Sequence, residues 1–109
     1  MAFSIVATTD FEKELKRLAK KYPSIKNDVA GLVEKLTIDP HHGVPIGNEC
    51  YKIRLAITSK GKGKSGGARV ITHIQVTRQY LYMLSIYDKS EAENITDVEV
   101  VRRLRDLEY

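Results

Sequence analysis

The chain has 109 residues, 42% hydrophobic and 29% charged, a composition that fits one ordinary globular domain spanning residues 1–109 and excludes a disordered chain. No apolar run approaches the roughly 20 residues that span a bilayer, and the N-terminus lacks the basic segment of a signal peptide. The single cysteine, Cys50, excludes an internal disulfide framework, so we expect a cytoplasmic protein without a membrane partner.

The first part of the chain predicts a strand followed by two helices. Residues 2–7 are short and apolar, as in a strand. A capping box at Thr9 predicts a helix that begins there, and Pro23 ends it because the residue before a proline is pushed out of helical geometry. Ser24 is placed to cap a second helix that stops near Pro40. We expect this helical hairpin to cover one face of a sheet.

The second part predicts three strands and a last helix. Residues 41–49 are rich in turn formers and predict a loop. Strands are predicted at 51–58, 68–76 and 80–87, and their short connections imply antiparallel pairing. A capping box at Thr96 predicts a C-terminal helix. The whole is an α+β domain, in which helices pack on one face of a small, mainly antiparallel twisted sheet and the other face stays partly open.

Positive charge is concentrated in the middle of the chain. Residues 50–87 hold no Asp or Glu and have a net charge of +7, whereas residues 1–49 are neutral and residues 88–109 carry −3. Alternation along the first central strand places Lys52 and Arg54 side by side on the face away from the core. Such a local field predicts a polyanion partner, although solvent-facing charges on a strand remain an alternative.

Several kinds of chemistry are excluded in this basic region. Gly63-Lys64-Ser65 copies the end of a P-loop, but Thr58 replaces the first glycine and a strand follows instead of a helix. No carboxylate pair is present, which argues against two-metal nuclease chemistry. The adjacent His41 and His42 have no further ligand nearby, so we expect no metal and no cofactor. His73 is expected to be structural, and Tyr87 either faces the open side or lies in the core.

Three runs, CYKIRLA, GKGKSGGARVI and MLSIYDKSE, occur in this order along the chain. They resemble the RelE superfamily of bacterial type II toxins, and the second is most similar to its HigB-type branch. The resemblance covers essentially the whole chain and implies a RelE-like, microbial-RNase-type fold. It also implies a ribosome-dependent endoribonuclease that cuts mRNA in the ribosomal A site, and a cognate antitoxin that holds the toxin inactive in a hetero-oligomer.

The resemblance also implies roles for individual residues. Lys52 and Arg54 match the family's basic pair, Arg69 matches its next arginine, and Lys89 falls where RelE has an arginine. RelE's cleavage tyrosine is replaced by Ile95. We expect Lys52 to act as base, Arg54 and Arg69 as phosphate clamps, and Lys89 as a clamp or proton donor, in a metal-free attack of the 2′-OH on the adjacent phosphate. The loop cations expected to grip the RNA backbone are Lys60, Lys62 and Lys64.

Two other functions stay open. A toxin of the same fold related to the ParE branch would poison DNA gyrase and leave mRNA intact. A non-catalytic RNA-binding module would show exposed aromatic stacking platforms among its basic residues, whereas Tyr80 and Tyr82 lie in an apolar strand and favour a core position.

Overall fold

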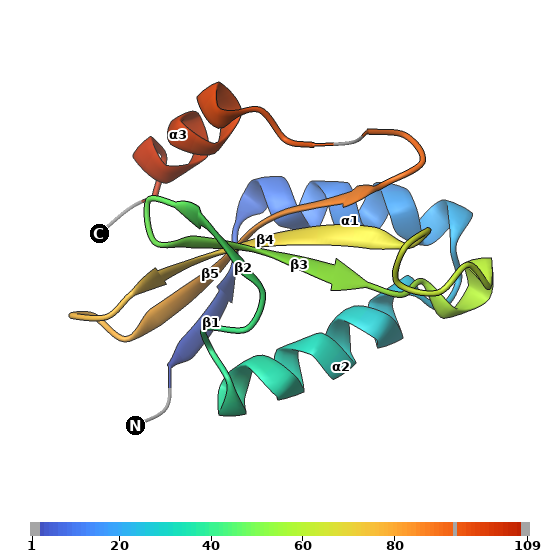
Figure 1. The fold of residues 1–109 in the computed structure, drawn as a ribbon, viewed down its shortest axis with the longest axis horizontal. Helices are drawn as coiled ribbons and strands as arrows, with labels where there is room; N and C mark the ends of the chain where they lie inside the picture. Colours follow the sequence, from blue (N-terminus) through green and yellow to red (C-terminus); the bar gives the residue numbers. More distant parts are fainter. Residues whose placement is uncertain (1–2, 93, 108–109) are drawn as a thin grey trace.

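In the computed structural model, which describes residues 3–92 and 94–107, a five-stranded sheet carries helices against both of its faces (Figure 1). Its strands are β1 (Ser4–Ala7), β2 (Val44–Gly47), β3 (Cys50–Leu55), β4 (Ala68–Gln75) and β5 (Tyr80–Asp88). The helices are α1 (Thr9–Lys21), α2 (Ile25–Ile38) and α3 (Asp97–Arg105), and η1 (Thr58–Lys60) is a 3-10 turn. The strand order is β1-β5-β4-β3-β2, in which β1 pairs parallel with β5 and the other neighbours pair antiparallel. The predicted α+β class is confirmed.

The helical hairpin covers one face of this sheet, as predicted. Apolar side chains of α1 and α2, among them Phe11 and Leu36, pack with Ile53 and Val70 in the main core. The cap of α1 lies one residue earlier than predicted. The Thr8 hydroxyl accepts a hydrogen bond from the Phe11 amide at 3.2 Å and donates to the Met83 carbonyl at 3.0 Å, so the same side chain also ties the helix to β5.

The other face is not left open, because α3 packs on it. A second core joins Ile71, Leu84 and Tyr87 of the sheet to Val100 of α3. Residues 89–92 and 94–96 lie between the end of β5 and this helix and pass over the sheet (Figure 1). The expectation of helices on one face was therefore wrong for α3. The physical reason is that β5 is mostly apolar or aromatic and is buried from Leu81 to Asp88, and a strand buried on both faces needs a cover on each.

The predicted loop at residues 41–49 contains an additional edge strand, β2. Its residues are all exposed and it contains Pro45, so it shows neither the alternation nor the composition by which a strand is predicted from sequence. Proline is tolerated in an edge strand because no neighbouring strand needs its amide as a donor. β2 pairs only with residues 50–52 of β3. In addition, β3 ends at Leu55 instead of continuing to Thr58, which begins η1. None of the described helices combines the length and apolar character needed to cross a membrane.

Candidate functional site

The predicted basic residues of the sheet lie on the face away from α1 and α2. Ile53 points into the main core, so its neighbours Lys52 and Arg54 project to the opposite face. In the register of β3 and β4, Arg54 lies opposite Arg69, and Lys52 lies opposite Ile71. Cross-strand partners stand on the same face. The structure therefore places Lys52 and Arg54 on one face, as the alternation predicts, and adds Arg69 to the same face.

Two of these residues differ in how they are held. Lys52 is half-buried, and its ammonium group donates a hydrogen bond to the side-chain oxygen of Asn94, in the segment between β5 and α3. Arg54 is exposed. Sequence reasoning missed Asn94, and no local pattern marks it, since the contact joins residues 42 positions apart. Lys89 is exposed, and its backbone amide donates to the Gly67 carbonyl at 3.0 Å, next to the start of β4.

Arg69 is almost completely buried, with 4% of its surface exposed. Its guanidinium group donates to the carbonyls of Lys64 at 2.9 Å, Ala68 at 3.0 Å and Ser65 at 3.4 Å. Arg69 therefore holds the glycine–lysine loop together in this structure. Gly67 belongs to the same arrangement, because a Cβ at this position would lie 2.2 Å from the Leu55 carbonyl oxygen.

Tyr87 lies opposite Arg69 in the register of β4 and β5, on the same face. Its side chain is buried, and its hydroxyl lies near the backbone of Ile95 without a hydrogen bond of normal geometry. Burial raises the pKa of Tyr87, although the nearby Arg69 charge opposes this. The open question about Tyr87 is thus answered: it is a core residue on the basic face.

The three loop lysines have different surroundings. The Lys60 ammonium lies 2.8 Å from a carboxylate oxygen of buried Asp88 and 3.1 Å from the Ser90 hydroxyl. This side chain therefore pairs with a buried acid of the protein itself. Lys62 and Lys64 are exposed. Lys64 lines a cavity of about 220 Å³ together with Lys52 and Arg54. The structure therefore joins Lys64 to the strand residues and separates Lys60 from them.

The other titratable groups near this face are structural. His73 is buried, and its Nδ1 lies 3.0 Å from the Asn48 carbonyl, while its ring stacks on Tyr82. Burial lowers the pKa of His73. Burial, with a smaller contribution from Glu49, raises the pKa of Cys50 to about 11. Neither group is set up for acid–base work near neutral pH. Across the part of the chain that the structure describes, no group of three or more His, Cys, Asp or Glu residues could hold a metal ion.

Comparison with known proteins agrees with this architecture. The structure is similar to that of a doubly substituted E. coli RelE toxin in the free state, with a TM-score of 0.67 and 18% identity over 95% of this chain and 99% of that one. It is also similar to isolated E. coli RelE (TM-score 0.53, 18% identity, 97% and 100% covered). A third similar structure is the substituted E. coli RelE with a peptide of the antitoxin RelB (TM-score 0.50, 20% identity, 89% and 98% covered).

These likenesses concern the fold. The sequence itself matches a family profile described as the RelE toxin of the RelE/RelB toxin–antitoxin system, over residues 7–107. This match includes both cores, the basic strands and the glycine–lysine loop. The chain therefore belongs to the RelE toxin family.

Proposed function

We propose that this toxin is a ribosome-dependent mRNA endoribonuclease that cuts message in the A site, in the bacterial cytoplasm where ribosomes translate. The observation that supports it is the placement of Lys52, Arg54 and Arg69 on one face of the sheet, with no acidic residue between positions 50 and 87. A phosphodiester in an enzyme site needs such preorganised positive charge where the transition state becomes more negative.

The proposed reaction is an in-line attack of the RNA 2′-OH on the adjacent phosphate. The neutral amine form of Lys52 takes the 2′-OH proton and becomes the ammonium, the P–O5′ bond breaks as the new bond forms, and the products are a 2′,3′-cyclic phosphate and a 5′-OH. Arg54 is exposed and contacts the phosphate directly. Arg69 supplies charge from below the surface, and exposed Lys89 protonates the leaving oxygen. No step requires a metal ion.

The proposed partners are the ribosome, through its rRNA and A-site mRNA, and a cognate antitoxin. The antitoxin proposal is supported by the similar E. coli RelE that was solved with a peptide of its antitoxin RelB. A toxin–antitoxin hetero-oligomer would be the inactive form.

The test is cell-free translation of a defined message with purified protein, followed by primer extension to map RNA 5′ ends, with and without ribosomes. We expect cuts at A-site codons of translated message only. The Lys52→Ala/Arg54→Ala variant should lose cleavage while remaining folded, and Lys26→Ala, an exposed lysine on α2, should cut normally. Intact message in the wild-type reaction would overturn the proposal. If protein synthesis also continued, inhibition of gyrase supercoiling would become the next assay.

A further inference from the structure

The outer edge of the sheet is incomplete next to the basic residues. β2 pairs with residues 50–52 of β3, so residues 53–55 of β3 have no strand partner on that side among the residues that the structure describes. Two cavities of about 220 and 280 Å³ lie at this place, and His42, Arg54 and Lys64 line both of them. Because the cavities share these residues, they adjoin each other. Together they form what we name the edge groove, bordered by α2, residues 42–44, β3 and the glycine–lysine loop.

Cationic side chains are present along the whole edge groove. Lys52 lines the smaller cavity, Lys35 of α2 lines the larger one, and Arg54 and Lys64 lie between them in both. Within residues 3–92 and 94–107, no ion pair engages Lys35, Arg54 or Lys64. Their positive charge is therefore available to a bound anion.

One carboxylate, that of Asp28, also lines the larger cavity. Its oxygens already accept hydrogen bonds from the Ser24 hydroxyl at 2.8 Å and from the amide and hydroxyl of Thr58 at 3.0 and 2.6 Å. Asp28 thus joins α2 to η1, and its carboxylate is already stabilised by these neutral donors. The balance of charge in the groove remains positive.

The walls between the cations are largely apolar. Leu32, Leu55 and Ala56 line the larger cavity, and exposed Val44 lines the smaller one. Single-stranded RNA is bound by this combination, in which cations track the phosphates while bases rest on apolar or aromatic side chains. Each cavity is smaller than the roughly 300–1,000 Å³ of an enclosing small-molecule pocket, so an extended ligand that places one nucleotide in each fits better.

We propose that the edge groove binds the single RNA strand next to the cleaved phosphate, which rests on the proposed function for the identity of the ligand. Arg54, Lys64 and Lys35 contact successive backbone phosphates, and the His42 ring stacks on one base. The message would then run from the basic face, over the open edge of β3, to the C-terminal half of α2. Lys35 and His42 thereby acquire a role that the strand and loop motifs do not indicate.

The experiment measures binding without requiring cleavage. A fluorescein-labelled, fully 2′-O-methylated eight-nucleotide RNA is titrated with purified protein, and anisotropy gives the Kd over a series of salt concentrations. For single strands, each lost phosphate contact lowers the slope of log Kd against log salt by about 0.7. We expect that decrease in Lys35→Ala and in Lys64→Ala. Lys26→Ala, on the same helix but outside the groove, should keep the wild-type slope.

His42 is tested in the same assay. His42→Ala should weaken binding by about fivefold or more through the lost stacking, and His42→Phe should restore the affinity because it keeps an aromatic ring. Wild-type slopes in both lysine variants, or a wild-type protein that does not bind this RNA at low salt, would overturn the edge-groove proposal whatever the cleavage assay shows. If the slopes decrease as expected but message stays uncut in translation reactions, the result would support RNA binding by the edge groove and overturn the proposed nuclease activity.

Discussion

Lys60 lies in the lysine-rich loop that the sequence suggests is exposed to solvent, but in the structure it forms an ion pair with the buried carboxylate of Asp88. The Asp88 side chain has no exposed surface, and it accepts hydrogen bonds from Lys60 at 2.8 Å, from the Tyr22 hydroxyl at 2.5 Å and from Ser90. Burial alone would raise the pKa of Asp88, but these donors outweigh it and hold the pKa well below its usual value. The hydrogen bond to Asp88 in turn raises the pKa of Lys60.

Removing the Lys60 ammonium should therefore be costly. In Lys60→Ala the Asp88 charge would remain buried without its cation, and the free energy of unfolding should fall by about 3–5 kcal/mol. Lys62→Ala, two residues away and exposed, should change it by less than about 0.5 kcal/mol. Urea unfolding at pH 7 measures both. Equal stability of the two variants would mean that the ion pair does not form in solution.

The conformation of the glycine–lysine loop should depend on the branched shape of the Arg69 guanidinium group as well as on its charge. A lysine at this position keeps the charge but cannot bridge the carbonyls of Lys64, Ser65 and Ala68 together. In Arg69→Lys we expect amide hydrogen exchange of residues 61–67 to accelerate about tenfold or more, since hydrogen bonds from a charged donor contribute roughly 1.5–3 kcal/mol each. Lys52→Ala should leave exchange in this loop unchanged. Unaltered exchange in Arg69→Lys would show that the loop holds its conformation without Arg69.

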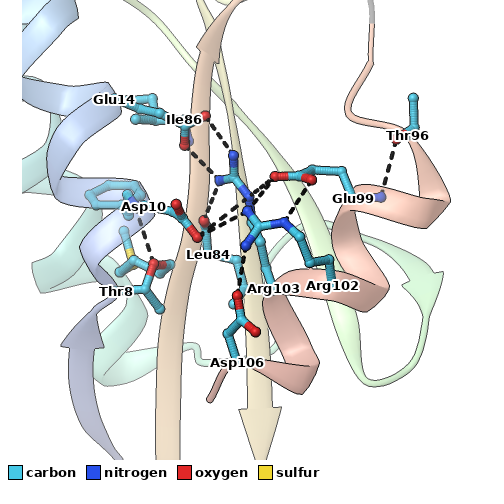
Figure 2. Close-up of polar contacts among 12 residues, drawn as sticks. Thr8, Asp10, Glu14, Leu84, Ile86, Thr96, Glu99, Arg102, Arg103 and Asp106 are labelled. Carbon is cyan, nitrogen blue, oxygen red and sulfur yellow. Dashed lines mark hydrogen bonds and ion pairs between the residues drawn. The ribbon is translucent and has the colours of Figure 1, made fainter. Parts of the chain in front are cut away.

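At the scale of elements, α3 depends on polar contacts to stay on the sheet. Nine residues are too few for a helix to be stable alone, and α3 contributes a single buried apolar residue, Val100. Arg103 compensates (Figure 2). It contacts both carboxylate oxygens of Glu14 on α1 at 2.8 and 3.0 Å, the Leu84 carbonyl of β5 at 2.8 Å, and Glu99 of its own helix at 2.9 Å.

Two neighbouring arginines of α3 offer a matched pair of variants. Arg103 is 11% exposed, whereas Arg102, which binds Glu99 and Asp106, is 44% exposed. Arg103→Ala should lower the free energy of unfolding by about 2 kcal/mol or more, because it removes the cationic partner of Glu14 and a donor to the Leu84 carbonyl. Arg102→Ala should cost no more than about 1 kcal/mol. If denaturation midpoints of the two variants coincide, Arg103 does not anchor the helix.

The whole molecule should lose stability in acid. Asp88 and Glu99 both have pKa values below their usual 3.8 and 4.5, and hydrogen bonds from Arg102 and Arg103 lower that of Glu99 to about 2. Such groups stabilise the fold fully above the usual pKa, and the contribution disappears as pH falls toward the folded-state value. Unfolding free energy should therefore be level near pH 6 and decrease below about pH 4. Glu99→Gln should reduce that decrease; an unchanged pH profile in this variant would contradict the assignment.

Local sequence patterns were enough to predict much of the fold and part of the candidate site. Period-two alternation placed Lys52 and Arg54 on the correct face, and the apolar strand around Tyr82 predicted the core position of this residue. The exposed edge strand β2 has no such pattern, and the contacts of Lys60 with Asp88 and of Lys52 with Asn94 join residues 28 and 42 positions apart. These features depend on tertiary packing, which no window of neighbouring residues contains.

The parallel pairing of β1 with β5 sets the order in which this protein can fold during its own synthesis. The Ser4 amide donates to the Gln79 carbonyl and the Thr8 hydroxyl to that of Met83, 75 residues along the chain. At about 5–20 residues per second, the first strand waits roughly 4–15 seconds for its partner to be synthesised. Both cores also need β5. An interrupted chain that stops before residue 80 thus lacks a strand that both cores require, and the cell meets a folded toxin only after β5 has been synthesised.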